Sequence, residues 1–274
     1  MDTQQRQTTS GGLPIERDCR KETLAIDDHA LVEVVLPLCT WLKGLTNSLI
    51  GEGGGRVLVG LCGSAAAGKS TLSQLLCAAC RVLWGASSVA SVSMDAYSFS
   101  NAYLSAESAE HLGRPCTLKD VKGRPDTLDS ASFLRDLDRL RFPSARTIML
   151  PAYSRDLHDP VPNCVAVAPN CQIVVVEGLH LLHHDGLWKA ISAALHRTIF
   201  LDIPRSTCFD RVVGRKVANG RSRESSEAHF ERVDGPLWDQ LQEEKTRANL
   251  VLTLPVFDQG APQNPLVARA QKSV

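Results

Sequence analysis

The chain carries no net charge and contains no long uninterrupted apolar run. Thirty lysine and arginine residues balance thirty aspartate and glutamate residues among 274 positions. Such a balance gives no electrostatic reason to expect a nucleic acid or a membrane surface as the main partner. The longest apolar stretch near the N-terminus, residues 24–42, is interrupted by Asp27, Asp28 and Glu33, so we expect an amphipathic helix there rather than a membrane span.

The first 28 residues lack the apolar core of a secretory signal, and their acidic residues are unlike a typical transit peptide. We therefore interpret residues 1–28 as a flexible N-terminal tail. Residues 259–274 contain two prolines and show no periodicity, which favours a C-terminal tail.

The cysteine pattern lacks the features of a disulfide framework or a metal site. Nine cysteines form an odd set, scattered along a chain too large to need disulfide staples, which predicts reduced thiols in the cytoplasm. Cys77 and Cys80 form a CxxC pair, but there is no second pair and both lie within an apolar helical pattern. We expect these two thiols to be buried rather than to bind a metal or act in redox chemistry.

Short β-rich runs alternate with helical or loop sequence along most of the chain. The length suits one sizeable α/β domain, which we place at residues 29–258. Alternation of this kind predicts a doubly wound parallel sheet covered by helices on both faces. The expected strands are residues 56–62, 88–94, 147–151, 172–178, 197–203 and 249–255.

A glycine loop, GSAAAGKST, occupies residues 63–71 and matches the P-loop pattern GxxxxGKS/T. The pattern needs glycine where the backbone turns tightly against an anion, then a lysine for the β- and γ-phosphates and a hydroxyl for Mg²⁺. The loop follows a predicted strand and opens a predicted helix, whose positive end attracts phosphate. ATP and Mg²⁺ are the expected cofactors. The predicted nucleotide-binding residues of the loop are Gly63, Ser64, Ala65, Ala66, Ala67, Gly68, Lys69, Ser70 and Thr71.

The rest of the sequence decides between P-loop classes. A GTPase would need an NKxD or TKxD motif to read the base, yet none of the nine lysines is followed two places later by aspartate. This absence favours a kinase that phosphorylates a small molecule. Asp95, Glu177 and Asp202 each come at or just after the end of a predicted strand, the edge where such sheets bind ligands. Residues 98–129 lack apolar periodicity, which predicts a long excursion over the site.

Four further blocks follow in order: SMDAYSFSNAYL at 93–104, KGRPDTLD at 122–129, LPAYSRDLHDP at 150–160 and VVVEGLHLL at 174–182. With the glycine loop, they resemble the P-loop kinases related to pantothenate kinase, uridine kinase and phosphoribulokinase, and especially their less characterised members. The resemblance covers about residues 56–255. It implies a nucleoside/nucleotide kinase-like P-loop NTPase fold with a helical lid at about 211–232.

The resemblance also implies roles for individual residues. Asp95 is expected to act as catalytic base, with Lys69 and Arg215 on the phosphates, and Arg211 is expected to help hold the nucleotide. Glu177 would join Ser70 in holding Mg²⁺. The sequence departs from the family pattern at Tyr97, Ser98, Leu128 and Ser154, so the resemblance does not carry over the identity of the acceptor. The expected acceptor-binding residues are Tyr97, Arg124, Tyr153, Arg155, His158 and His180.

The function this implies is transfer of the γ-phosphoryl group of ATP to a hydroxyl of a small polar metabolite. A nucleoside such as uridine, pantothenate, and a sugar or sugar acid all remain open as acceptors. The expected partner is this phosphoacceptor, and a homodimer stays open beside a monomer. The alternative function is a nucleotide-binding switch or scaffold, which would keep the P-loop but need no acceptor base.

Overall fold

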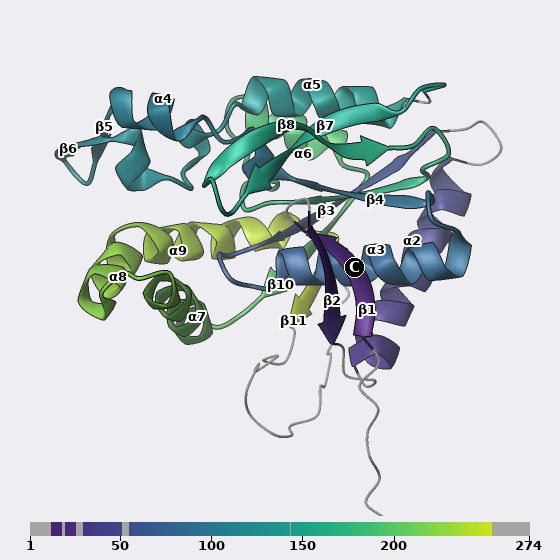
Figure 1. The fold of residues 1–274 in the computed structure, drawn as a ribbon, viewed down its shortest axis with the longest axis horizontal. Helices are drawn as coiled ribbons and strands as arrows, with labels where there is room; N and C mark the ends of the chain where they lie inside the picture. Colours follow the sequence, from purple (N-terminus) through teal and green to yellow (C-terminus); the bar gives the residue numbers. More distant parts are fainter. Residues whose placement is uncertain (1–11, 18–19, 26–29, 51–54, 143, 254–274) are drawn as a thin grey trace, which may run out of the picture.

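The computed structural model describes residues 12–17, 20–25, 30–50, 55–142 and 144–253 (Figure 1). Its centre is a parallel sheet in the strand order β11-β10-β3-β9-β4. The predicted α/β fold with a doubly wound parallel sheet is confirmed. The strands are β3 (Val57–Gly63), β4 (Val89–Ser93), β9 (Ile173–Glu177), β10 (Arg197–Asp202) and β11 (Leu250–Thr253).

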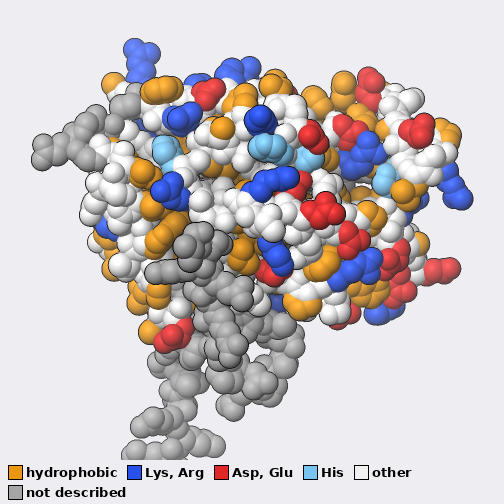
Figure 2. All heavy atoms as spheres, turned by 180° about the vertical axis from the view of Figure 1, so that it is seen from behind, with side chains coloured by type: hydrophobic (Ala, Val, Ile, Leu, Met, Phe, Trp, Pro, Cys, Tyr) orange, Lys and Arg blue, Asp and Glu red, His pale blue; other side chains and the backbone are white. Residues whose placement is uncertain are grey.

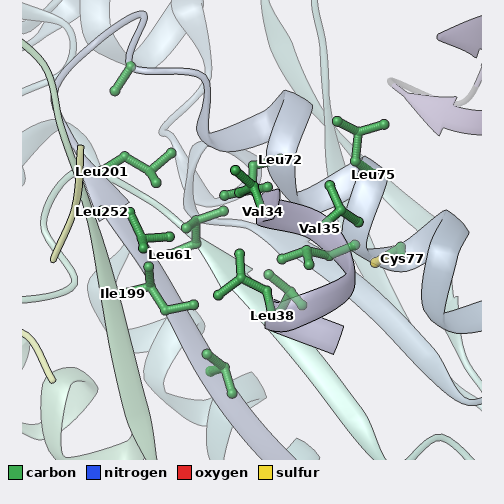
Figure 3. Close-up of a cluster of buried hydrophobic side chains, with 14 of the residues drawn as sticks. Val34, Val35, Leu38, Leu61, Leu72, Leu75, Cys77, Ile199, Leu201 and Leu252 are labelled. Carbon is green, nitrogen blue, oxygen red and sulfur yellow. The ribbon is translucent and has the colours of Figure 1, made fainter. Parts of the chain in front are cut away.

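The central strands form because their apolar runs are buried on both faces of the sheet. Every residue of β3 and of β9 is buried, as expected for parallel strands between two helical layers. One face packs against a π-helical turn, η1 (Leu31–Val35), and against α2 (Leu36–Leu49) and α3 (Lys69–Trp84). Figure 3 shows Leu38 of this layer beside Leu61 and Ile199 of the sheet. The other face packs against α5 (Ser130–Arg141) and α6 (Leu187–Ala194).

One predicted strand takes a different place. Residues 147–151 belong largely to β7 (Ile148–Ser154), which pairs antiparallel with β8 (Asp159–Val167) in a separate hairpin. The expectation that this run joins the parallel sheet is therefore wrong. The physical reason lies in its burial, which alternates from buried Ile148 to exposed Met149 to buried Leu150, as in a strand with one face to solvent. The hairpin contacts edge strand β4.

The excursion predicted at 98–129 consists of short elements that project from the body of the domain (Figure 1). Residues 211–218 and 223–229 of the predicted lid are helical, and residues 219–222 connect these two helices. The excursion contains α4 (Asn101–Ala106), β5 (Ser108–His111), β6 (Arg114–Thr117), η3 (Leu118–Val121) and η4 (Pro125–Thr127), after η2 (Met94–Tyr97). The helices of this part of the chain are α7 (Arg205–Ala218), α8 (Arg223–His229), η5 (Phe230–Asp234) and α9 (Gly235–Glu244), followed by η6 (Lys245–Arg247).

Part of the predicted N-terminal tail is described by the structure. There, β1 (Gly12–Arg17) and β2 (Arg20–Ala25) pair as an antiparallel hairpin. The predicted C-terminal tail, residues 259–274, lies outside the described residues. Among the helices that are described, none has both the length and the apolar character needed to cross a membrane.

The cysteine pair and the balanced charge of the sequence can both be followed in the structure. Cys77 and Cys80 are buried in α3 as free thiols, which confirms the prediction of burial. On the face in Figure 2, basic and acidic side chains are interspersed, in keeping with the balanced charge of the sequence.

Candidate active site

The glycine loop joins the buried end of β3 to the start of α3. Gly63 has φ 143°, and a Cβ atom there would lie 2.7 Å from the carbonyl oxygen of Leu201. Gly68 has φ 98° directly before the first residue of α3. Both positions need glycine because side chains disfavour a positive φ, and Gly63 also has no room for one. The loop therefore presents its backbone N–H groups at a helix N-terminus, the arrangement that binds phosphate.

Lys69 is folded back over this loop. Its Nζ donates hydrogen bonds to the carbonyl oxygens of Gly63, at 2.9 Å, and Ser64, at 2.8 Å. Burial lowers the pKa of Lys69, while the carboxylates of Glu177 and Asp95 act in the opposite direction. An ammonium group held by weak carbonyl acceptors in a buried site is ready to exchange them for phosphate oxygens.

Ser70 and Glu177 bring a hydroxyl and a carboxylate together. The Ser70 Oγ lies 2.9 Å and 2.8 Å from the two carboxylate oxygens of Glu177 and donates to them. Glu177 is buried at the end of β9. Burial raises its pKa, and the negative charge of the nearby Asp95 raises it further. Because the buried carboxylate is costly to ionise on its own, a bound cation would stabilise its charged form. Clustered oxygen atoms of this kind fit Mg²⁺, which prefers hard oxygen ligands.

Asp95 follows β4 on the neighbouring strand. Ser93 pairs with Glu177 across the sheet, so Asp95 comes two residues beyond the level of Glu177. Its carboxylate is exposed to the same cleft. Asp202, the third residue at a strand end, does not line the cleft. Its carboxylate instead accepts a hydrogen bond from Lys245 Nζ at 2.9 Å.

Two arginines complete the polar lining, Arg215 of α7 and Arg155, which follows β7. Burial lowers the pKa of Arg215, and the positive charge of the nearby Arg155 lowers it further. Arg211 instead donates from Nη1 to the carbonyl oxygen of Ala66, at 3.2 Å. The glycine loop, α7 and the segment after β7 all contribute to this cleft, so basic and acidic side chains lie together in it. Its full lining is Ala65, Ala66, Ala67, Gly68, Lys69, Ser70, Thr71, Ser93, Asp95, Arg155, Glu177, Gly178, Leu179 and Arg215.

A second cavity adjoins this cleft between α3, β4 and the β7–β8 hairpin. Among the residues that the sequence analysis expects to bind the acceptor, Tyr153 and Arg155 line this cavity. Gln74 and Arg81 of α3 also line it, and sequence reasoning missed both. A signal was available, because Ser70, Gln74 and Arg81 share one helical face by their spacing of 4 and 11 residues.

Tyr97 does not reach either cavity. It is buried in the hydrophobic core against the Phe133 ring, with ring centroids 4.8 Å apart, and its hydroxyl donates to Asp136 Oδ2 at 3.0 Å. Burial raises the pKa of Tyr97. The expectation that this side chain contacts the acceptor is corrected by its inward direction, which follows from the 3₁₀ turn after β4.

Arg124 and His180 are also used elsewhere. Arg124 donates to the Asp126 carboxylate, at 2.6 Å from Nη2, and to the Glu110 carbonyl oxygen at 2.9 Å. His180 is fully buried, and its Nε2 donates to the carbonyl oxygen of Gly123 at 2.6 Å. Neither residue lines the two cavities, so both serve to hold the excursion in place.

His158 acts through its backbone. It has φ 54°, and its carbonyl oxygen accepts hydrogen bonds from Asn101 Nδ2, Lys122 Nζ and the Tyr153 hydroxyl, at 3.0, 2.9 and 2.9 Å. The imidazole lines neither cavity. Three of the sequence blocks therefore bind one another at this carbonyl oxygen.

Comparison with known proteins gives matches over most of the chain. The model of the phosphoribulokinase / uridine kinase family matches residues 58–254. An uncharacterized protein of Escherichia coli strain K12, YggC, is 29% identical over 199 residues, covering 73% of this chain and 78% of the relative. The uridine kinase of the same strain is 28% identical over 198 residues, covering 72% and 86%.

Solved structures give the same picture. A putative fructose transport system kinase from Silicibacter sp. TM1040 is 26% identical and covers 75% of this chain and 94% of its own, with a TM-score of 0.64. The D-glycerate 3-kinase from Cryptococcus neoformans shares the fold at 14% identity, covering 80% of this chain and 94% of its own with a TM-score of 0.57.

Proposed function

The chain belongs to the phosphoribulokinase / uridine kinase family and is an ATP-dependent kinase of small molecules, and from that premise we propose that it phosphorylates a hydroxyl of a small polar metabolite. The observation that carries the proposal is the meeting of Lys69, Asp95 and Glu177 in one cleft. A P-loop alone would serve a switch. A carboxylate exposed beside the phosphate site serves a transfer to an acceptor.

The phosphate end would work through the loop and Lys69. On binding ATP, Lys69 exchanges the carbonyl oxygens of Gly63 and Ser64 for oxygens of the β- and γ-phosphates. Ser70 and Glu177 would hold Mg²⁺, directly or through water, and the ion would supply positive charge against the phosphate oxygens.

The acceptor end would work through Asp95. Phosphoryl transfer has a loose transition state, so the carboxylate mainly orients the hydroxyl and accepts its proton late. Arg215 and Arg155 face the same space, where their guanidinium groups stabilise the charge of the group in transit. Arg211, bonded to Ala66, holds the loop against the lid.

The acceptor is a polyhydroxylated or anionic molecule in this proposal. The cavity next to Asp95 is lined by polar groups that include Tyr153 and Arg155. Relatives that share most of this chain include a uridine kinase and a putative fructose transport system kinase, so nucleosides and sugars both belong among the candidates. Pantothenate and sugar acids remain candidates on the same chemistry. Free thiols throughout the described part of the chain favour the cytoplasm as its location.

One screen tests the proposal. Purified protein with ATP and Mg²⁺ is assayed for ADP release against nucleosides, pantothenate, hexoses, pentoses and sugar acids. We expect at least one acceptor to raise ADP release well above the rate with water alone. Failure of every acceptor, with ATP still bound tightly, would favour the switch or scaffold instead.

A further inference from the structure

The second cavity extends away from the phosphate site along α3. It shares Ser70, Asp95 and Glu177 with the cleft, so the two spaces are continuous at the reacting end. Beyond these residues the walls come from α3, from the edge strand β4 and from the β7–β8 hairpin. The phosphate chemistry of the P-loop does not account for this outer part.

A polar stripe on α3 follows the cavity outward. Ser70, Gln74 and Arg81 all line it. At 100° per residue, spacings of 4 and 11 place these three positions within about 40° of one another around the helix. At 1.5 Å per residue, Ser70 and Arg81 lie about 16 Å apart along the axis. One helical face thus carries a hydroxyl, an amide and a guanidinium in line with the reacting end.

The charge at the outer end has no counterpart in the cavity. The Nε of Arg81 is buried and has no hydrogen-bond partner within the described ranges of the chain. The acidic residues of the lining, Asp95 and Glu177, lie at the opposite end, beside Ser70. A buried donor without an acceptor costs free energy, which a ligand oxygen would recover. A guanidinium group binds a carboxylate or a phosphate through two parallel hydrogen bonds.

We propose that this cavity is an acceptor subsite in which Arg81 binds an anionic group at the end of the acceptor remote from the reacting hydroxyl, with Gln74 between the two ends on the same helical face. The inference rests on the proposed function and narrows the acceptor to a hydroxylated organic anion. The hydroxyl faces Asp95, and the carboxylate or phosphate lies toward the C-terminal end of α3.

The test compares anionic acceptors with neutral counterparts of the same skeleton. Carboxylates are represented by gluconate against sorbitol and pantothenate against pantothenol, and phosphates by fructose 6-phosphate against fructose. Calorimetry measures the affinity of each compound in the presence of Mg²⁺ and a non-hydrolysable ATP analogue, and ADP release is measured separately with ATP. The variants are R81Q, the charge-conserving R81K, and R135Q as a matched control, because Arg135 is exposed on α5 outside both cavities.

We expect at least one anion to bind wild type more tightly than its neutral partner. R81Q should weaken that binding by about 10- to 100-fold, the range for a hydrogen-bonded charged group. R81K should restore part of it, while R135Q changes nothing and all variants keep their affinity for the ATP analogue. If R81Q does not fold, R81K decides, because loss of the two parallel hydrogen bonds should still weaken anion binding.

The two proposals fail in different ways. Anion binding that depends on Arg81 without any ADP release would leave the subsite standing and overturn the kinase reaction. Turnover of neutral acceptors with no preference for anions, or equal effects of R81Q on both members of a pair, would overturn the subsite alone. So would the absence of tighter anion binding by wild type.

Discussion

The two ends of the cleft are built in different ways. The phosphate end is a single run, residues 63–71, whose function lies in its backbone conformation and in the adjoining Lys69 and Ser70. The proposed acceptor end is assembled from α3, β4 and the β7–β8 hairpin, whose side chains line one cavity. The excursion binds this hairpin through the carbonyl oxygen of His158. At the phosphate end the residues are expected to contact a ligand, whereas many residues of the hairpin and the excursion contact one another.

This difference leads to opposite expectations for mutation. A change at the phosphate end should remove activity while the domain stays folded, because its charged groups are buried at a cost that the ligand recovers. A change in the blocks that bind one another should lower stability while the chemistry continues. The following predictions test this contrast, from the largest expected effect on activity to the smallest.

Lys69→Ala should have the largest effect. Removing a cation from the transferring phosphates should lower kcat/KM by about 10³- to 10⁵-fold, the range for a comparable cationic group in phosphoryl transfer. The domain should remain folded, because burial already disfavours the charged form of this lysine. ADP release and circular dichroism measure the two effects. Unchanged ATP affinity and turnover would contradict the phosphate site.

Asp95→Asn should come next. The variant keeps the shape of the side chain but cannot accept a proton, so turnover should fall by about 10²- to 10⁴-fold. Affinity for ATP should be retained, because in the proposed reaction Asp95 contacts the acceptor and not the nucleotide. Single-turnover kinetics and calorimetry separate these quantities. A loss of less than about threefold, far below that range, would mean that Asp95 is only a structural residue at a strand end.

Glu177→Gln should raise the Mg²⁺ concentration needed for half-maximal activity by about 10- to 100-fold, the range for weakened metal-site groups. Burial followed by the nearby Asp95 raises the pKa of Glu177 in the folded protein. The stability that this group contributes is therefore greatest below the ordinary glutamate pKa and is lost as the pH rises through the raised value.

The same variant should therefore be more stable than wild type, without nucleotide, at neutral pH. The difference should shrink as the pH falls toward the ordinary glutamate value, where the wild-type side chain is also neutral. Thermal unfolding across this pH range measures it. A variant less stable than wild type at neutral pH would mean that the carboxylate is well satisfied without a cation.

Much of the fold could be predicted because buried parallel strands leave uninterrupted apolar runs. Residues 56–62 and 172–178 carry that signal, and both lie in the central sheet. Residues 147–151 look similar but form an antiparallel hairpin, since a five-residue run cannot show which neighbour it will pair with. The predicted tail at 1–28 contains a short hairpin, which its polar composition did not indicate.

Within the candidate site, the residues of the motif and the strand ends could be predicted, whereas the side-chain directions of the acceptor blocks could not. The sequence placed Lys69, Ser70, Asp95 and Glu177 near one another because a motif and strand ends depend on local order, and the structure brings them into one cleft. Their roles stay predictions. Side-chain direction in the acceptor blocks depends on residues far away, since the partner of Tyr97 lies 39 positions along the chain. Arg81 belongs to no motif, and its one sequence signal is the spacing that places it on the same helical face as Ser70 and Gln74.

Tyr97→Phe is the sharpest test of the contrast because it should leave activity unchanged. The substitution removes the hydrogen bond to Asp136 in a buried environment, so the free energy of unfolding should fall by about 1 to 2 kcal/mol. Tyr153→Phe is the matched change: it removes the hydrogen bond from the hydroxyl to the His158 carbonyl oxygen, which holds the Tyr153 ring in place at the proposed acceptor cavity. That variant should raise the acceptor KM. Denaturant unfolding and acceptor titrations compare the two. If Tyr97→Phe raised the acceptor KM as much as Tyr153→Phe does, Tyr97 would belong to the acceptor site after all, and the division between the two ends of the cleft would fail.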